Sequence, residues 1–207
     1  MKDHVGKSNM TMTRRIMHDL HCACGRHFRR WLYHALDVAE QPGLRYAVLG
    51  GVLNTVQCPS CECIARVDVP LLYRDASRGH LVYVYPAGSE ESAGEIRGQI
   101  VKMVQDLRDS EPEADVMTPS LMFGLEQLGA AIGDELDDDE KPGSVSFDVR
   151  PGTASERGAR VLSGRVALHI GGCVYSWREG GRLHVRIIGP RKRLESVTLD
   201  DGKPMGY

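Results

Sequence analysis

Four of the six cysteines in this 207-residue chain lie in two close pairs, Cys22 with Cys24 and Cys58 with Cys61. Thiolates are preferred ligands of structural zinc, which takes four ligands in a tetrahedron with Zn–S distances of about 2.3 Å. Neighbouring sulfurs in such a tetrahedron are about 3.8 Å apart, so each pair must lie on a tight turn. The spacing therefore predicts one Zn²⁺ site with Cys22, Cys24, Cys58 and Cys61 as its ligands.

The residues around each pair favour such turns. Pro59 presets a turn within the second pair, and Gly25 relaxes the backbone just after the first. The first pair has only one intervening residue, and in an extended chain residues i and i+2 are about 6.5 Å apart at Cα, so the chain must bend there. On the sequence alone, His21 or His27 could replace a member of the first pair, and Cys63 could replace a member of the second.

A zinc site of four thiolates carries a net charge of about −2 and needs N–H donors or cations beside it. Arg26, Arg29 and Arg66 are close in sequence and can supply the cations. A catalytic zinc keeps an open position, and no His-x-Glu precedes the second pair as it does in zinc deaminases. We therefore expect a structural ion, with buried thiols or a redox switch as the alternatives. Cys173 has no partner nearby, which predicts a packed core thiol.

Short strands and one short helix are predicted around the cysteine pairs. The first pair lies between two strands within residues 14–37. Pro42 fits the first turn of a helix, because a helix start has no partner for the N–H that proline lacks. This helix ends at Gly50-Gly51, where the absence of a Cβ permits a left-handed cap. Strands follow the second pair at residues 64–72 and 81–85.

Two amphipathic helices are predicted after these strands. Ser89 can cap the first, and Glu90 and Glu91 favour its N-terminal dipole. Its apolar face contains Ile96, Ile100, Met103, Val104 and Leu107. The second helix starts at Thr118-Pro119, and its apolar stripe contains Leu121, Met122, Leu125, Leu128 and Ile132.

After Pro142-Gly143 the hydropathy pattern changes to period two, which marks a domain boundary. Residues 166–170 and 183–187 alternate on either side of Gly180-Gly181 and predict a hairpin, to which residues 145–149 and 194–199 add two strands. The predicted fold class is α+β. It comprises a mobile arm (1–13), a zinc-ribbon-like β unit with two amphipathic helices (14–140), and a small antiparallel β unit (143–207) that packs on it.

The order of the motifs resembles the CpXC domain family. The resemblance is carried by the two cysteine pairs and by three further elements: Gly50-Gly51-Val52-Leu53-Asn54, Val69-Pro70-Leu71-Leu72-Tyr73-Arg74-Asp75, and the strand that ends at Tyr85-Pro86. It covers roughly residues 16–140 and departs at the first pair, where the family's fuller form is Cys-Pro-x-Cys. The resemblance implies a bacterial protein in which paired cysteines bind metal, and it implies no reaction.

Composition excludes several classes of protein. The chain is 42% hydrophobic and 6% aromatic, with 26 basic and 28 acidic residues, unlike collagen, a coiled coil, a wholly disordered chain or a highly basic nucleic-acid binder. Its longest uncharged run, residues 46–61, contains polar residues and is shorter than the roughly 18 apolar residues of a membrane helix. Since the N-terminus also lacks a signal-peptide pattern, we expect a cytoplasmic protein, where reducing conditions favour metal-bound cysteines.

Basic residues gather towards both ends of the chain and acidic residues in its middle. This arrangement favours either association by charge complementarity, within the chain or between copies, or plain solvation of the charges. Phosphate loops, nucleophile elbows and EF-hand spacings are absent from the sequence. We therefore expect a non-catalytic, zinc-stabilised protein-interaction or scaffold module that presents residues 69–86 and its acidic helices to a protein partner. The alternative is a zinc ribbon that binds nucleic acid through Arg14, Arg15, Arg26, Arg29, Arg30 and Trp31, with Arg191-Lys192-Arg193 as a second cluster.

Overall fold

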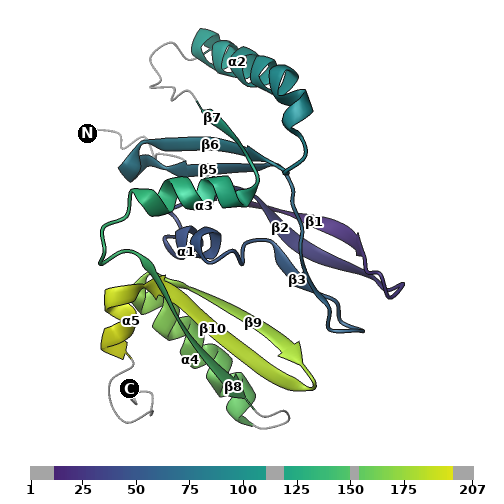
Figure 1. Ribbon diagram of the computed structural model, residues 1–207, viewed down its shortest axis with the longest axis vertical. Helices are drawn as coiled ribbons and strands as arrows, with labels where there is room; N and C mark the ends of the chain where they lie inside the picture. Colours follow the sequence, from purple (N-terminus) through teal and green to yellow (C-terminus); the bar gives the residue numbers. More distant parts are fainter. Residues whose placement is uncertain (1–11, 111–118, 150–153, 198–207) are drawn as a thin grey trace, which may run out of the picture.

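The computed structural model describes residues 12–110, 119–149 and 154–197 (Figure 1). Over these residues the fold is α+β, with a five-stranded sheet, a three-stranded sheet and a two-stranded hairpin. Most of the expected arm, residues 1–13, lies outside the described part of the chain. Among the helices of the described part, none is both long and apolar enough to span a membrane.

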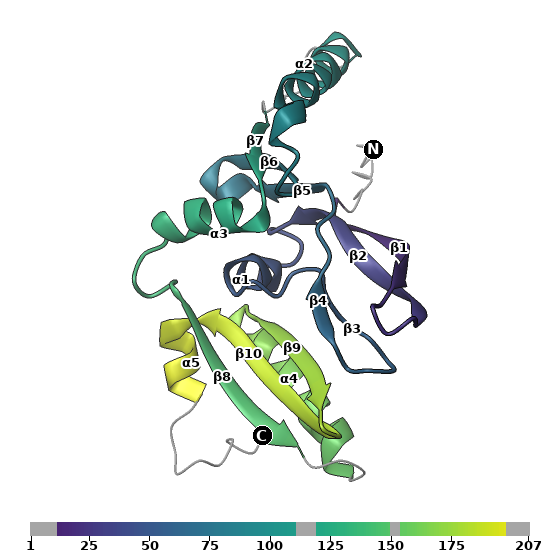
Figure 2. The same ribbon diagram turned by 45° about the vertical axis from the view of Figure 1, so that its right-hand side comes forward.

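The five-stranded sheet has the order β1-β2-β5-β6-β7 and carries the first cysteine pair. β1 and β2 form the expected antiparallel hairpin, and β2 then pairs in parallel with β5 at residues 35–37 alone. The hairpin therefore projects beyond the rest of the sheet (Figures 1 and 2). The five strands span Arg14–His21, His27–Asp37, Leu71–Asp75, His80–Tyr85 and Ser120–Phe123.

Helices pack on both faces of this sheet. Successive side chains of β6 point to opposite faces and contribute to two separate apolar layers. Val82 and Val84 belong to the main core, with α1 (Gly43–Leu49) and α3 (Leu125–Asp134). Tyr83 and Tyr85 face α2 (Ala93–Ser110), whose buried face is made of Ile96, Ile100 and Val104 as expected. Burial of these alternating side chains supplies the main stabilisation of the sheet.

Two details of the helix predictions are wrong. Ser89 makes no side-chain cap, and a 3-10 turn, Glu90–Ser92, precedes α2. A similar turn, Ala76–Arg78, joins β5 to β6. Met103 is exposed, and the side chain of Leu107 lies outside the described residues.

The second predicted helix is in fact a strand followed by a helix. Leu121 and Met122 lie in β7, which pairs in parallel with β6, whereas Leu125, Leu128 and Ile132 lie in α3. Gly124 separates the two elements with φ of +81°, a conformation that glycine adopts without steric cost. The apolar residues of β7 and α3 keep helical spacing across Gly124, which is why the sequence predicted a single helix. Thr118, its predicted start, lies outside the described residues.

The C-terminal unit is a three-stranded antiparallel sheet of order β8-β10-β9 with a helix on one face. The Gly180-Gly181 turn does join a hairpin, but its first strand is β9. The predicted strand at residues 166–170 belongs to helix α4, and the one at 194–199 begins within helix α5. The elements are β8 (Pro142–Val149), α4 (Ala154–Ile170), β9 (Cys173–Glu179), β10 (Arg182–Pro190) and α5 (Arg191–Val197).

The prediction at residues 166–170 failed because five residues are too few to distinguish the two-residue alternation of a strand from the 3.6-residue repeat of a helix. The buried residues Ser163, Ala167 and Ile170 follow helical spacing, and Leu168, between the last two, is 83% exposed. For residues 194–199, Leu194 packs with Ala167 and Ile170 as part of a helix, and residues 198 and 199 lie outside the described chain.

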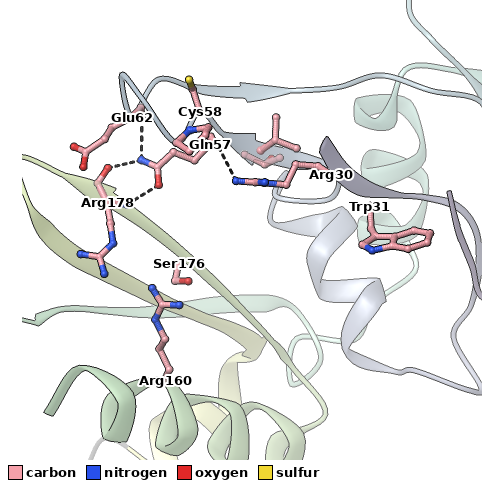
Figure 3. A pocket seen from close by; sticks show the side chains of 11 residues that line it. Arg30, Trp31, Gln57, Cys58, Glu62, Arg160, Ser176 and Arg178 are labelled. Carbon is pink, nitrogen blue, oxygen red and sulfur yellow. Dashed lines mark hydrogen bonds between the residues drawn. The ribbon is translucent and has the colours of Figure 1, made fainter. Parts of the chain in front are cut away.

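The C-terminal unit contacts the first unit through α1. A Cβ added to Gly43 would lie 2.1 Å from the carbonyl oxygen of Gly172, so the two backbones approach closely there. Tyr46 on α1 also donates a hydrogen bond to the carbonyl oxygen of Glu140 (3.0 Å), in the segment that leads into β8. Beside this contact a cleft of about 500 Å³ separates residues of β2 and β3 (Thr55–Gln57) from residues of α4 and β9 (Figure 3).

Candidate metal centre

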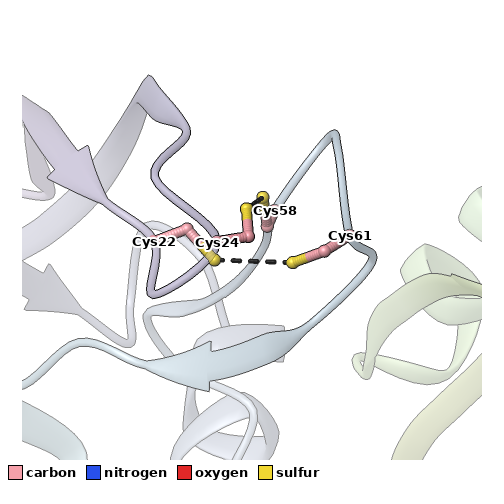
Figure 4. Close-up of side chains that lie close together, drawn as sticks. All are labelled: Cys22, Cys24, Cys58 and Cys61. Carbon is pink, nitrogen blue, oxygen red and sulfur yellow. Dashed lines mark hydrogen bonds between the residues drawn. The ribbon is translucent and has the colours of Figure 1, made fainter.

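The first cysteine pair lies in the turn that closes the β1–β2 hairpin. Gly25 donates its N–H to the carbonyl oxygen of Cys22, and Cys22 donates to that of Arg26, both at 2.9 Å. Gly25 has φ of +84°, where a residue with a Cβ would be strained. This turn supplies the bend that two cysteines separated by one residue require, so both sulfurs point to the same side (Figure 4).

The second pair lies in the turn between β3 and β4 (Ile64–Arg66), which form a short antiparallel hairpin. Cys58 donates its N–H to the carbonyl oxygen of Cys63 (2.9 Å), and Glu62 donates to that of Cys58 (3.1 Å). The N–H of Ser60 points at Cys58 Sγ, 3.4 Å away. The two pairs therefore lie at the tips of two separate hairpins.

The structure brings all four predicted ligands together. Their sulfur atoms lie within 4.8 Å of one another. Cys22 Sγ is 3.5 Å from Cys61 Sγ, and Cys24 Sγ is 3.7 Å from Cys58 Sγ (Figure 4). These distances are close to the roughly 3.8 Å expected between sulfurs on a tetrahedral zinc ion. The four side chains thus fit one metal ion of that size.

Backbone N–H groups provide local stabilisation for the thiolates. The N–H groups of Cys61 and Ser60 lower the pKa of Cys58 to about 6. The N–H of Cys63 acts in the same direction on Cys61, but the neighbouring sulfurs of Cys22 and Cys24 raise the pKa of Cys61 to about 12. Four thiolates this close repel one another, so a divalent cation is what would hold all of them deprotonated.

The model of the CpXC protein family matches residues 20–132, a span that contains both turns. The chain belongs to the CpXC family. No curated protein and no solved structure matches it. The family match ends before β8, so the C-terminal unit of this CpXC protein lies outside it.

Two of the three arginines expected beside the sulfurs are instead paired with carboxylates in this CpXC protein. Arg29 donates to Asp19 (2.6 Å), and Arg66 contacts Asp68 (3.0 Å) and Glu126 (2.5 Å). Arg26 contributes through its backbone N–H, which lowers the pKa of Cys24. Cys61 acts in the same direction, but Cys22, burial and Cys58 together raise the pKa of that thiol overall. In both turns of this chain the N–H donors to the sulfurs come from the backbone of the turn itself.

The alternative ligands lie outside the cluster. The rings of His21 and His27 face each other with centroids 3.9 Å apart, and neither belongs to the group of sulfurs that could hold an ion. Cys63 is exposed, and its Sγ lies 3.9 Å from the carbonyl oxygen of Ile64. Cys173 begins β9 and packs against the main core, where burial raises its pKa to about 12. It is a packed thiol, as predicted.

Two residues that the sequence did not single out position the cysteine turns. Asn54 accepts a hydrogen bond from the N–H of Tyr33 (2.8 Å) and donates one to its carbonyl oxygen (3.0 Å), which fixes β3 against β2. Gln57 donates to the carbonyl oxygen of Glu62 (2.9 Å) within the second turn and also bonds the backbone of Arg178. Asn54 was visible only as part of the family resemblance, and Gln57 gave no local signal.

Proposed function

We propose that a zinc ion bound by Cys22, Cys24, Cys58 and Cys61 joins the β1–β2 and β3–β4 hairpins into a zinc-ribbon-like unit. Four sulfur donors favour zinc, whereas Mg²⁺ and Ca²⁺ prefer oxygen ligands. The four thiolates complete a tetrahedron and leave no position for a reacting water, so the role of the ion is structural. The observation that carries this proposal is the meeting of all four sulfurs from two separate turns.

The β3–β4 hairpin buries little of its own surface, and outside the cysteines it is held by the polar contacts of Asn54 and Gln57. All three residues of β4 are exposed and those of β3 are half-buried. A two-stranded hairpin of this kind is marginal in water. Structural zinc contributes about 10–16 kcal/mol of apparent binding free energy at neutral pH, which is comparable to the stability of a whole domain. Zinc is therefore the main force that fixes the two tips.

The zinc-stabilised unit acts, in this proposal, as a non-catalytic protein-interaction module in the cytoplasm. The expected surface, residues 69–86, is unsuitable because β5 and β6 are inner strands of the sheet. A better surface is the β1–β2 hairpin, where Met17 and Trp31 lie opposite each other and are 39% and 56% exposed. Exposed Trp and Met side chains are enriched at protein interfaces.

Native mass spectrometry of the full chain tests the metal part of the proposal. We expect the mass of one zinc ion per chain. Cys61→Ser should lose the ion, whereas Cys63→Ser, which changes a nearby exposed cysteine outside the cluster, should retain it. Retention of the metal by both variants, or its loss from both, would contradict the assignment.

Photo-cross-linking tests the interaction part. A photoreactive residue in place of Met17 should form specific adducts with a protein partner or a second copy of the chain. The same residue in place of Val101, an exposed apolar position on α2, is the matched control and should form none. Equal labelling at the two positions would show that the hairpin is not an interface.

Nucleic-acid binding is the second candidate, because Arg15 lies over the ring of Tyr33 (5.7 Å) and Arg30 over that of Phe28 (5.1 Å) on the same hairpin. Exposed aromatic and basic side chains together stack bases and neutralise phosphates. However, Lys192 in the second basic cluster is paired with Asp139 (2.6 Å). Binding of single-stranded DNA that falls steeply between about 50 and 200 mM salt would favour this candidate.

A further inference from the structure

The cleft between the two units is bordered by two strand edges that have no strand partner in the described chain. β9 is the outer strand of the sheet β8-β10-β9, so one of its edges is free. β2 pairs with β5 only at residues 35–37, which leaves the same edge of β2 without a strand partner at residues 29–33, although the side chain of Asn54 bonds it at Tyr33. The edge strands lie on opposite sides of the cleft of about 500 Å³ (Figure 3).

The free edge of β9 presents its backbone groups to the cleft. Arg178 donates its N–H to Gln57 Oε1 (2.9 Å), and its carbonyl oxygen accepts from Gln57 Nε2, so these groups point away from β10. Backbone groups of alternate residues in a strand point the same way. The N–H and carbonyl groups of Ser176 and Val174 therefore lie on this edge, beyond the reach of the single amide of Gln57.

β2 is arranged in the same way on the opposite side. Asn54 bonds both the N–H and the carbonyl oxygen of Tyr33, which shows that these groups point away from β1. The backbone of Trp31, two residues earlier, faces the same direction. Asn54 thus bonds the edge of β2 at Tyr33, and Gln57 bonds the edge of β9 at Arg178. The backbone groups two residues earlier on each strand remain available for pairing.

Cations exceed carboxylates around the cleft. Three arginines (Arg30, Arg160 and Arg178) line it, against one lining carboxylate, that of Glu62. Arg160 and Arg178 also share the carboxylate of Glu156. Arg30 has no carboxylate partner among the described residues, and its guanidinium contacts the carbonyl oxygens of Arg29 (2.8 Å) and Gln57 (3.5 Å). A guanidinium has five N–H donors, so these two contacts leave others that can bind a carboxylate.

The other end of the cleft is apolar. A second hollow of about 290 Å³ shares Trp31 and Thr55 with the first and lies between α1 and β9. Its walls include the side chains of Leu44, Ala47, Val52, Cys173, Val174 and Tyr175. The combined cleft therefore has a basic end, an apolar end and a strand edge that borders both.

We propose that this cleft binds an extended acidic segment of a protein partner, which adds a strand to the free edge of β9. The backbone of the segment pairs with Ser176 and Val174, a carboxylate binds Arg30, and an apolar side chain fills the hollow beside α1. Strand addition of this type takes its affinity from backbone hydrogen bonds and its specificity from the pockets. A nucleic-acid backbone has no regular N–H groups to pair with such an edge. The inference rests on the proposed interaction function and specifies the partner's chemistry.

Selection of displayed random peptides on the zinc-loaded full chain tests the charge requirement. We expect enriched sequences with acidic residues alternating with apolar or β-branched ones. A synthetic peptide of this pattern should bind Arg30→Gln about 10-fold or more weakly, because a charge-assisted hydrogen bond is lost. Arg29→Gln, the neighbouring position that pairs with Asp19, is the matched control and should bind normally. The absence of enrichment, or equal losses in both variants, would overturn the proposal.

Removal of edge hydrogen bonds tests the binding mode. Ser176→Pro deletes an N–H on the free edge, where proline is tolerated, and should abolish binding, whereas Ser176→Val keeps that N–H and should bind. N-methylation of alternate peptide amides should also abolish binding, which makes the test independent of how Ser176→Pro folds. Binding unaffected by N-methylation, or displacement of the peptide by single-stranded DNA, would refute strand addition. If position-17 adducts persist while the cleft binds no peptide, the interaction function stands and this inference fails.

Discussion

Asn54 offers a test of how the two hairpins are held together. Its side chain bonds both backbone groups of Tyr33 on β2, and its own carbonyl oxygen accepts the N–H of Val67 just after β4 (3.0 Å). It is 8% exposed and has φ of +54°, in the left-handed region. Asparagine is one of the few residues with a Cβ that adopts this conformation readily.

The structure gives a magnitude for two substitutions of Asn54. Asn54→Gly keeps the left-handed backbone but loses two hydrogen bonds, each worth about 1 kcal/mol, so the free energy of unfolding should fall by about 2 kcal/mol. Asn54→Ala loses the same bonds and adds about 1 kcal/mol of backbone strain, for a total of about 3 kcal/mol. Either value is a large fraction of the stability of a typical domain.

Urea unfolding in the presence of a chelator measures these values without a contribution from metal. Zinc affinity, measured by competition with a chromophoric chelator, should fall in the same order, because the second turn is less well positioned against the first. An unfolding free energy of Asn54→Ala equal to that of the unmodified chain would refute the bridging role. A larger loss in Asn54→Gly than in Asn54→Ala would refute the role of the left-handed backbone.

Two further predictions concern the core. Burial disfavours the charged form of Asp75, but hydrogen bonds from Ser77 and Arg45 outweigh it and hold the pKa of Asp75 below its usual value. Since the folded-state pKa is the lower one, this stabilisation is present above the unfolded pKa of about 4 and is lost as the pH falls through the folded value. Asp75→Asn should cost about 3 kcal/mol at neutral pH, because it leaves Arg45 with only the more distant carboxylate of Glu140 (4.0 Å) among its described acidic partners. It should also flatten the dependence of urea midpoints on acid pH, measured with chelator. An unchanged pH dependence would contradict this. Gly43→Ala should cost about 3 kcal/mol because its Cβ would overlap the carbonyl oxygen just before β9. Gly94→Ala, with open space around it, should cost nothing in the same thermal melts, and equal melting points for the two variants would refute the close approach.

The convergence of the four cysteines was predictable because its signal is local. Each cysteine pair carries its own turn residue, and a tetrahedral zinc ion bound by both pairs would require the two turns to meet. The helix at residues 43–49 was equally accessible, since Pro42 and the glycines after it mark both ends. Gly51, with φ of +65°, provides the left-handed residue.

The failures occurred where short apolar patterns fit more than one structure. Leu121 and Met122 fit a helical stripe, and pairing with β6, which lies far away in sequence, decided that they form a strand. The segment that contains Leu168 fits alternation as well as a helix. The cleft could not be predicted at all, since Arg30 and Arg178 are brought together only by the packing of the two units.

X-ray absorption spectroscopy at the zinc edge of the full chain, loaded with zinc under reducing conditions, tests the central claim most directly. Convergence of both hairpin tips on one ion predicts four sulfur neighbours at about 2.3 Å. A first shell with nitrogen or oxygen in place of any sulfur, or a chain that takes up no zinc, would contradict it.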